Sequence, residues 1–267
     1  MTKPDHKLPI SVFIITKDEE DRIVPTLEAI AGLVSEVIVV DSGSTDDTVA
    51  LAENYGARVI YNDWAGYGPQ KRFAEEQCSQ DWLFNLDGDE VVPEALADEI
   101  RQLFADGEPP HKAYSVPITE MFPTETKPHR FAFSLYPVRL YHKQAGRYSQ
   151  STVHDRVELA DGVHPGQLKT RIHHRTVRSL SEEMVKLIEY SDLQNDDLEK
   201  KGRKISSARI LTEFPLAFLK AYIGRRHFIR GFYGISTALN FAFYRHLRVA
   251  KHLERRIIKR QKQNRQR

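Results

Sequence analysis

Four short apolar runs, each followed by polar residues and then by a segment of helical periodicity, dominate the chain as far as Phe104. Each run has the length of a strand and is rich in β-branched or aromatic residues, which is typical of strands buried in a sheet. The alternation of such strands with helices predicts an α/β domain with a doubly wound, mostly parallel sheet. The predicted strands are residues 10–15, 37–40, 58–61 and 82–86.

The segments between these runs carry apolar residues at helical spacing, as at Ile23, Leu27 and Ile30. The spacing predicts helices at 23–33, 49–55, 69–77 and 93–104. Ser44 followed by Asp47 resembles a capping box that opens the second helix. Pro93 suits the first position of the fourth helix, where a missing N–H is tolerated.

The remaining sequence is less regular and is punctuated by proline. Short antiparallel strands are predicted at 113–116, 138–141, 153–159 and 169–173. A helix is predicted from Ser179 to Lys201, and residues 210–223 and 228–258 are predicted to be helical as well. The chain is therefore expected to divide into three parts, 1–107, 108–178 and 179–267.

Polar side chains gather where three of the predicted parallel strands end. In a doubly wound sheet, ligands bind outside the carboxyl ends of the strands, at the crevice where the strand order reverses. Carboxylates from distant parts of the sequence should therefore share one rim. These strand-end residues are Thr16, Lys17, Asp18, Asp41, Asp87 and Asp89.

Three carboxylates, those of Asp87, Asp89 and Glu90, stand within four residues and repel one another when ionised, so their proximity favours either a shared divalent cation or a solvated acidic turn. Side chains two residues apart in an extended segment point to the same side. One carboxylate could hold the metal while the other accepts hydrogen bonds from ribose hydroxyls. Lys71 or Arg72 could neutralise a diphosphate. The sequence lacks the Gly-x-Gly-x-x-Gly motif after the first strand and a phosphate loop, which argues against a dehydrogenase or a nucleotide-hydrolysing enzyme.

The composition, 40% hydrophobic and 28% charged over 267 residues, is that of an ordinary globular protein. No apolar run reaches the roughly 20 residues needed to cross a bilayer, and residues 1–9 lack the apolar core of a signal peptide. Cys78 has no second cysteine with which to form a disulfide. We therefore expect a cytoplasmic protein.

The charge is distributed unevenly. Residues 245–267 hold ten Lys or Arg and one acid, Glu254, whereas the rest of the chain holds 29 basic and 36 acidic residues. Basic tails bind phosphate groups, either of anionic lipid or of nucleic acid. Because no nucleic-acid-binding module accompanies the tail, we expect no nucleic acid. The apolar residues that precede the tail could pack on the domain, or they could form a helix face that enters the membrane interface while Arg and Lys meet anionic lipid; they are Tyr222, Phe228, Phe232, Phe241 and Phe243. We expect the second arrangement, with attachment to an anionic membrane surface on the inner face of the cytoplasmic membrane.

Four motifs together resemble the family 2 glycosyltransferases, at residues 10–20, 37–48, 66–71 and 84–90. The narrower likeness is to the branch that includes lipopolysaccharide-core β-glucosyltransferases. It is carried by VVDSGSTD at 39–46, GYGPQK at 66–71 and NLDGDE at 85–90. Weaker likenesses follow at Arg139-Leu140-Tyr141, at 153–155 and at 225–234.

This resemblance implies a nucleotide-sugar-binding, GT-A-like fold with a C-terminal helical extension. It implies an inverting transferase that moves a sugar from a nucleoside-diphosphate sugar, with UDP-glucose as the suggested donor. The acceptor would be a hydroxyl of a lipopolysaccharide-core or other lipid-linked glycan, and manganese or magnesium would be the metal. Residues 1–107 would bind the nucleotide sugar and 108–178 the acceptor, and 179–267 would form the basic helical extension.

The resemblance also assigns roles to residues. Relatives in this branch carry their catalytic base in a His-Glu pair, which here corresponds to His154 and Asp155, so Asp155 is the expected base. Glu158 and Glu120 are the competing candidates, and one of His173 and His174 could approach the diphosphate or metal. Asp89 would bind the metal, and the expected donor-binding residues are Thr16, Lys17, Asp18, Asp41, Lys71 and Asp87.

Two other functions fit the same sequence. A transferase to polyprenyl phosphate would have an acceptor that is already anionic and needs no base. A non-catalytic protein that binds membranes or polyanions could use the same fold, because fold alone does not determine function.

Overall fold

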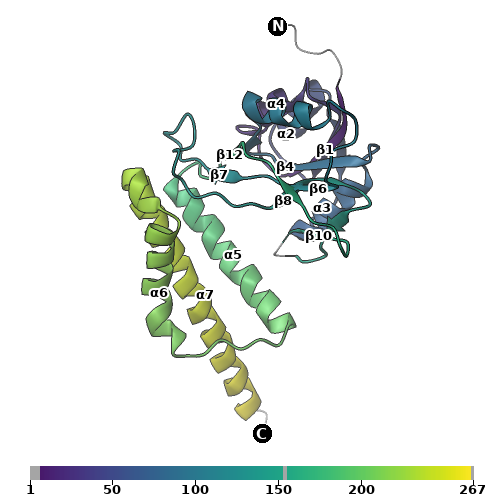
Figure 1. Ribbon diagram of the computed structural model, residues 1–267. Helices are drawn as coiled ribbons and strands as arrows, with labels where there is room; N and C mark the ends of the chain where they lie inside the picture. The colour runs from purple at the N-terminus through teal and green to yellow at the C-terminus, as the bar shows by residue number, and fades with distance from the viewer. Residues whose placement is uncertain (1–6, 153–154, 266–267) are drawn as a thin grey trace. The chain divides into compact units, whose positions relative to one another are not determined.

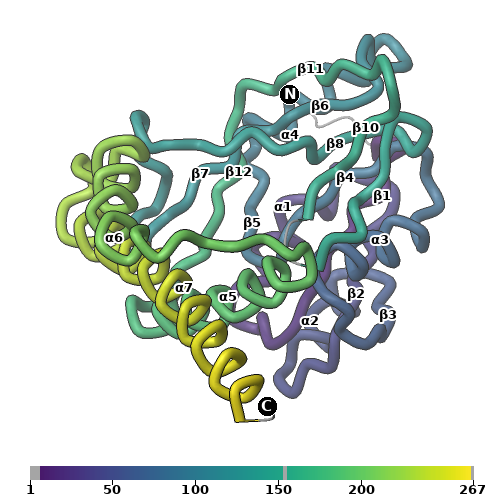
Figure 2. The backbone as a smooth tube through the Cα atoms, turned by 90° about the horizontal axis from the view of Figure 1, so that it is seen from below, coloured from purple at the N-terminus to yellow at the C-terminus, as the bar shows by residue number. Residues whose placement is uncertain are grey.

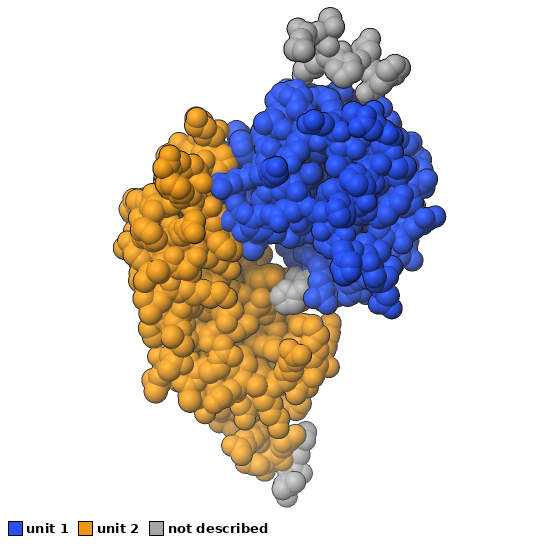
Figure 3. Space-filling model, viewed as in Figure 1, with its two compact units in different colours: residues 1–121, 134–176 blue, residues 122–133, 177–267 orange. Residues whose placement is uncertain are grey.

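The computed structural model describes residues 7–152 and 155–265. The chain forms two compact units (Figure 3). Unit 1 consists of Met1–Met121 and Ser134–Thr176, and unit 2 of Phe122–Phe133 and Val177–Arg267. The assignment of 1–107 and 108–178 to donor and acceptor stays a prediction.

A seven-stranded sheet in the order β11-β6-β8-β4-β1-β2-β3 organises unit 1 (Figures 1 and 2). The four predicted strands are present as β1 (Leu8–Thr16), β2 (Val34–Asp41), β3 (Arg58–Tyr61) and β4 (Trp82–Asp87), and they are mutually parallel. β8 (Val138–His142) runs antiparallel to β4 and to β6 (Ala113–Ser115), and β11 (Gly166–Gln167) is parallel to β6. The prediction of a mostly parallel α/β sheet is confirmed.

Alternate residues of β1 enter two different apolar cores. Val12 and Ile14 belong to the core that includes residues of α1 (Ile23–Ile30), α2 (Thr48–Asn54) and α4 (Glu94–Leu103), whereas Phe13 packs in the core that includes Ala74 of α3 (Tyr67–Glu76). Figure 1 shows α2 and α4 on one side of the sheet and α3 on the other. Both faces are therefore covered by helices, which is why β1 is apolar on both sides.

The irregular part of unit 1 adds two small sheets. β12 (Ile172–His174) lies between β5 (Glu90–Val91) and β7 (Ile118–Glu120), and β9 (Gly146–Tyr148) pairs with β10 (Val157–Leu159). The expectation that all these pairings would be antiparallel is wrong, because β12 is parallel to β7 and β11 is parallel to β6. β5, β7, β9 and β11 were not predicted. Strands of two or three residues show little periodicity, and β6, β10 and β12 only overlap longer predicted segments.

Two local predictions need correction. Ser44 does not cap α2: its hydroxyl donates to Asp41 Oδ1 at 2.5 Å and accepts from the N–H of Asp18 at 2.9 Å. The residue before α2 is Asp47, whose side chain makes no capping hydrogen bond. Pro93 precedes the first residue of α4 instead of occupying its first helical position.

Unit 2 is helical. Ser179 caps α5 (Leu180–Lys200) by accepting from the N–H of Glu182 at 3.1 Å. α6 (Arg209–Leu219) continues into the π-helix η1 (Lys220–Gly224), followed by the 3₁₀ turn η2 (His227–Arg230) and α7 (Gly231–Arg265). α7 packs against both α5 and α6, as Figures 1 and 2 show. Among the described residues, no helix is both long and apolar enough to cross a membrane.

Part of the charge of the predicted basic tail is matched by acids of α5 and α6. Lys251 lies 2.6 Å from Asp192, and Arg255 lies 2.6 Å from Asp196. Arg245 lies 2.6 Å from Glu213, a carboxylate that is 5% exposed. Residues 245–265 form the C-terminal part of α7. Three of their cations, Arg245, Lys251 and Arg255, bind α7 to α5 and α6.

Glu213→Gln should destabilise unit 2. Glu213 accepts from Arg209 at 2.5 Å and from Arg245, and a neutral amide cannot compensate these guanidinium groups. Urea unfolding followed by far-UV circular dichroism should show a loss of about 1.5–3 kcal/mol. Glu254→Gln, at an exposed position of α7, is the matched control and should change stability by less than about 0.5 kcal/mol.

This stabilisation should also depend on pH. Burial acts to raise the pKa of Glu213, but Arg245 and Arg209 hold that pKa below its ordinary value of 4.5. A carboxylate with a lowered pKa in the folded state contributes stability above its unfolded pKa, and that contribution is lost as the pH falls through the folded pKa. The difference between Glu213→Gln and the parent should therefore shrink below about pH 4.5; a constant difference would contradict the ion-pair origin.

Candidate active site

The register of three parallel strands brings their polar ends together. Thr16 of β1 is opposite Asp41 of β2, and Ile15 is opposite Asp87 of β4. β1 is the strand from which the order runs in opposite directions, to β2 and β3 on one side and to β4 on the other. Thr16, Asp41 and Asp87 therefore lie along one edge of the sheet, at the point where such sheets bind ligands.

Lys71 joins two acids at this edge. Its ammonium lies 2.8 Å from Asp87 Oδ1, 2.5 Å from Asp155 Oδ2 and 5.5 Å from the centre of the Tyr148 ring, and the residue is 1% exposed. Burial acts to lower the pKa of Lys71, but the neighbouring Asp87 and the other acids raise that pKa above its ordinary value. The ammonium is therefore charged, and it links the β4 end to Asp155.

Arg139 of β8 is a second cation of the site. Antiparallel pairing of β8 with β4 brings it to Asn85, to which it donates a hydrogen bond. It lies 3.1 Å from Asp87 and 2.7 Å from Glu90. Burial raises the pKa of Glu90, whereas Lys71 and Arg139 outweigh burial at Asp87 and hold its pKa far below the ordinary value.

Asp89 contacts a different pair of cations. Its Oδ1 lies 3.1 Å from His174 Nε2, and its Oδ2 lies 3.3 Å from Arg22, which also binds Glu19. β12 pairs with β5 so that His174 is opposite Glu90. Burial acts to lower the pKa of His174, but Asp89 and the other acids raise it to about 9. His174 is therefore a cation at neutral pH, and it holds the pKa of Asp89 low despite burial.

Three side chains of the site have the donor atoms of a metal centre. One carboxylate oxygen each of Asp87 and Glu90 and one ring nitrogen of His174 lie within 4.8 Å of one another. Two carboxylates and an imidazole suit a divalent cation such as manganese, provided that His174 is deprotonated. The residues present thus fit a metal. Asp89 does not belong to this group of three but lies beside it through its contact with His174.

Asp41 and Asp18 hold the loops that follow β1 and β2. Asp41 Oδ2 accepts from the N–H groups of Gly43 at 2.8 Å and Ser44 at 2.9 Å, and Asp18 Oδ1 accepts from the N–H of Thr45 at 2.8 Å. Asp18 has a left-handed backbone, with φ of 52°. The two carboxylates therefore shape this part of the edge.

Two further predicted donor-binding residues lie at the end of β1. Lys17 is exposed. Thr16 is buried, and its hydroxyl has no hydrogen-bond partner among the described residues. A ligand hydroxyl or phosphate oxygen within reach would satisfy this group.

The start of α3 holds the loop that leads to Asp155. The N–H of Gly68 donates to Ser151 O at 3.0 Å, and that of Tyr67 donates to Thr152 O at 3.2 Å. A Cβ on Gly68 would lie 2.3 Å from Ser149 O, so only glycine permits this approach. The GYGPQK motif therefore has two structural roles. Its glycines allow residues 149–152 to approach the start of α3, and its Lys71 pairs with Asp155.

The other predicted candidates for the base lie as follows. His154 is outside the described residues. Glu158 is on β10 and pairs with Arg156 at 3.8 Å. Glu120 is on β7, in register with His174. Of the three predicted acids, Asp155 is the one bound to Lys71.

Arg139 and Arg22 were not predicted as site residues, and Glu90 was predicted only as one of three neighbouring carboxylates that could share a cation. Two of these residues belong to segments that resemble the family: Glu90 is the last residue of the NLDGDE motif, and Arg139 is the first residue of the Arg139-Leu140-Tyr141 likeness. His174 was considered only as one of a histidine pair. Nothing in the sequence around Arg22 indicates that it reaches Asp89.

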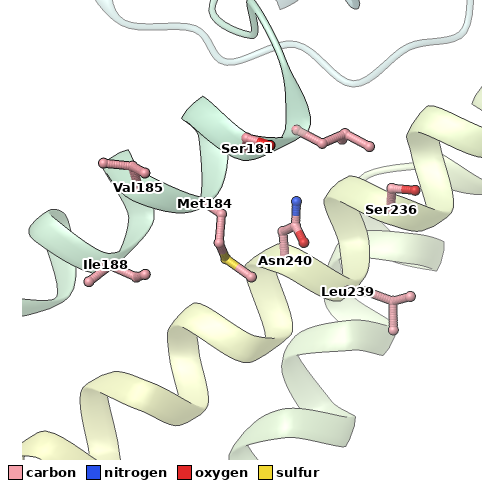
Figure 4. A pocket seen from close by; sticks show the side chains of 8 residues that line it. Ser181, Met184, Val185, Ile188, Ser236, Leu239 and Asn240 are labelled. Carbon is pink, nitrogen blue, oxygen red and sulfur yellow. The ribbon is translucent and has the colours of Figure 1, made fainter.

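A pocket of about 550 Å³ lies in unit 2 between α5 and α7 (Figure 4). Figure 4 shows Met184 and Asn240 pointing into the space between the two helices. The lining is mostly apolar and contains no titratable side chain, so we do not assign the reaction to it. Its lining residues are Leu180, Ser181, Met184, Val185, Ile188, Ser236, Leu239 and Asn240.

Gly68→Ala should disturb the site without removing a charge. The added methyl must displace the backbone at Ser149 and Ser151, and overpacking of this kind destabilises by about 1–3 kcal/mol. Urea unfolding measures the loss. Gly32→Ala, where a Cβ would meet nothing within 4 Å, is the control. Equal stability of the two variants would show that the loop does not depend on this close approach.

Comparison with known proteins gives consistent relatives. The model of the family "Glycosyl transferase family 2" matches residues 11–160. An uncharacterized glycosyltransferase of Rickettsia felis is 41% identical over 91% of this chain and 88% of its own length. The lipopolysaccharide core biosynthesis glycosyltransferase LpsC of Rhizobium meliloti is 30% identical over 95% of each chain.

Among solved structures, glucosyl-3-phosphoglycerate synthase from Mycobacterium tuberculosis, in complex with Mn²⁺ and UDP, is similar with a TM-score of 0.45 and 20% identity. That alignment covers 74% of this chain and 81% of the synthase. A similarity at this level adds nothing to the family assignment, which is carried by the family match and by the relatives in sequence. The chain belongs to glycosyl transferase family 2.

Proposed function

We propose that the protein transfers a sugar, with inversion, from a nucleoside-diphosphate sugar to a hydroxyl of a lipopolysaccharide-core or other lipid-linked glycan. The supporting observation is the edge of the sheet formed by the ends of β1, β2 and β4, where Lys71 and Arg139 both bind Asp87. The acceptor class is proposed by analogy with LpsC, whose name places it in lipopolysaccharide core biosynthesis. UDP-glucose is the proposed donor.

The reaction exchanges one bond for another at the anomeric carbon. The acceptor oxygen attacks from the face opposite the diphosphate, the bond to the diphosphate breaks, and the diphosphate leaves with the electron pair. The acceptor proton passes to Asp155, a carboxylate held by Lys71. Lys71 and Arg139 are fixed charges that stabilise the negative charge developing on the leaving group.

A divalent cation, manganese or magnesium, belongs to this proposal. Asp89 is the proposed ligand, and Asp87, Glu90 and His174 offer the neighbouring donor atoms. When bound, the cation neutralises charge on the departing diphosphate. Because His174 is protonated with a pKa of about 9, its participation would require release of that proton.

The remaining donor contacts are proposed for the loops at the strand ends. Thr16, Lys17 and Asp18 would line the donor beside β1. Asp41 would contact the nucleobase or ribose, and Asp87 the ribose. Because Asp41 already accepts from two backbone N–H groups, its contribution would be a preformed turn as well as a contact.

Attachment to an anionic membrane completes the proposal, with the protein peripheral on the inner face of the cytoplasmic membrane. The cations that extend beyond the α5 contacts are exposed and would meet lipid phosphate. They are Lys259, Arg260, Lys262 and Arg265.

Asp89→Asn should abolish metal-dependent donor binding. The parent should show a raised melting temperature with nucleotide sugar plus manganese or magnesium, because a ligand that prefers the native state stabilises it. The variant should lose this shift and at least about 100-fold of any donor hydrolysis. Asp81→Asn, at an exposed position, is the matched control. Wild-type behaviour of Asp89→Asn would remove the metal assignment, and a parent inert to all sugars would favour a non-catalytic binding protein.

Asp155→Asn separates two acceptor classes. A hydroxyl acceptor needs a base, so its removal should lower kcat by about 10²–10⁴. A polyprenyl-phosphate acceptor is already anionic and needs no base. The ion pair between Asp155 and Lys71 is the observation that favours this second candidate, because it gives Asp155 a structural role that does not require it to be the base. Rates measured with both acceptor classes decide: a near-normal rate of Asp155→Asn on the phosphate would favour the second candidate.

A further inference from the structure

α6 and η1 carry their large apolar side chains on the side that faces away from their packing contacts. The buried positions of this segment include Glu213, Ala217 and Ala221. By contrast, Leu211 is 80% exposed and Leu216 63%. We call the exposed set the α6 outer face: Leu211, Phe214, Leu216, Leu219 and Ile223. An ordinary surface helix shows the opposite arrangement, with its apolar stripe packed and its polar side in water.

The apolar surface continues past the turn that ends η1. Phe228 of η2 is 51% exposed and Phe232, in the first turn of α7, is 69% exposed. The Tyr222 ring lies 5.2 Å from that of Phe218 and 6.3 Å from that of Phe228, so aromatic contacts link η1 to η2. An exposed apolar surface formed by several elements marks a site of interaction with a partner or a membrane.

The charges around this surface identify the partner. The 40 residues between Glu213 and Glu254 contain no Asp or Glu and seven Lys or Arg. Lys220, the first residue of η1, and Arg226, directly before η2, are exposed. From Phe214 to Phe232 the charged residues are Lys220, Arg225, Arg226 and Arg230, and Arg230 pairs with Glu125. Apolar side chains flanked by an excess of cations are complementary to an anionic lipid interface.

A second copy of the chain is a poorer match. Two α6 outer faces brought together would place Lys220 and Arg226 of both copies at one interface, with no acid from residues 214–253 to compensate them. Like charges across an interface are unfavourable. Phospholipid phosphates supply the missing negative charge, and the acyl region accepts the apolar side chains.

We propose that the α6 outer face, together with Phe228 and Phe232, inserts into the interfacial region of an anionic bilayer. This inference rests on the membrane attachment in the proposed function, and it states which side chains anchor the protein in the membrane. The apolar contact comes from α6 and the turn into α7, and the exposed cations at the end of α7 add only electrostatic attraction. The bound helix lies in the interface plane, as amphipathic membrane-surface helices do.

Flotation of the full chain with vesicles tests the inference. The vesicles contain phosphatidylglycerol and phosphatidylethanolamine in one series and phosphatidylcholine alone in the other. The triple variant Leu216→Ser, Leu219→Ser, Ile223→Ser should bind the anionic vesicles at least about 10-fold more weakly than the parent. It removes apolar groups that would be buried in the bilayer when the protein is bound. Because these side chains are exposed, its thermal unfolding should match that of the parent.

A control removes exposed apolar side chains from another helix of unit 2. The variant Val185→Ser, Ile188→Ser, Leu193→Ser lies on α5 and should bind as the parent does. A second readout places a polarity-sensitive fluorophore on Leu219→Cys. Cys78 is 6% exposed and should not react. Vesicles should shift this fluorophore to the emission of an apolar environment.

Several results would overturn the inference. They are equal vesicle binding by the triple variant and the parent, equal loss in the control variant, or a dimer in light scattering that the triple variant dissociates. Donor hydrolysis in vesicle-free solution is measured separately on the same proteins. Its absence in the parent would count against sugar transfer alone, whereas loss of flotation with hydrolysis intact would count against the membrane anchor alone.

Discussion

The ammonium of Lys71 is buried between two carboxylates, and the geometry of the site depends on that arrangement. A charge removed from water is tolerated only when it is paired and hydrogen-bonded, so Asp87 and Asp155 must both stay close to it. One acid ends a central strand and the other follows an irregular loop. The pair therefore ties the sheet edge to the segment that carries the proposed base.

The same principle extends through the site as alternating charges. Arg139 lies between Asp87 and Glu90, and Asp89 lies between His174 and Arg22. In this network the neighbouring cations hold the pKa of Asp87 and Asp89 low, whereas burial raises the pKa of Glu90 despite Arg139. A diphosphate and its metal would enter a region where both signs of charge are already fixed, which is what electrostatic preorganisation requires.

Local signals and long-range pairings differ in how well the sequence predicts them. The strands from β1 to β4 and the strand-end acids were predictable because each is encoded by a few consecutive residues and by the rule that parallel strands end together. Arg139 was not, because its place follows from antiparallel pairing of β8 with β4. His174 likewise depends on the pairing of three-residue β12 with two-residue β5. The prediction that Ser44 caps α2 was wrong because the Ser44 hydroxyl donates to Asp41 instead.

The length of α7 has a consequence for how unit 2 can meet a membrane. The helix runs without interruption from Gly231 to Arg265, so Phe232 in its first turn and Lys262 near its end are about 45 Å apart. A flat bilayer that touches both must run nearly parallel to the helix axis. Because the two contacts are so far apart, they would engage different lipids, and each would keep the other close to the surface when one of them dissociates.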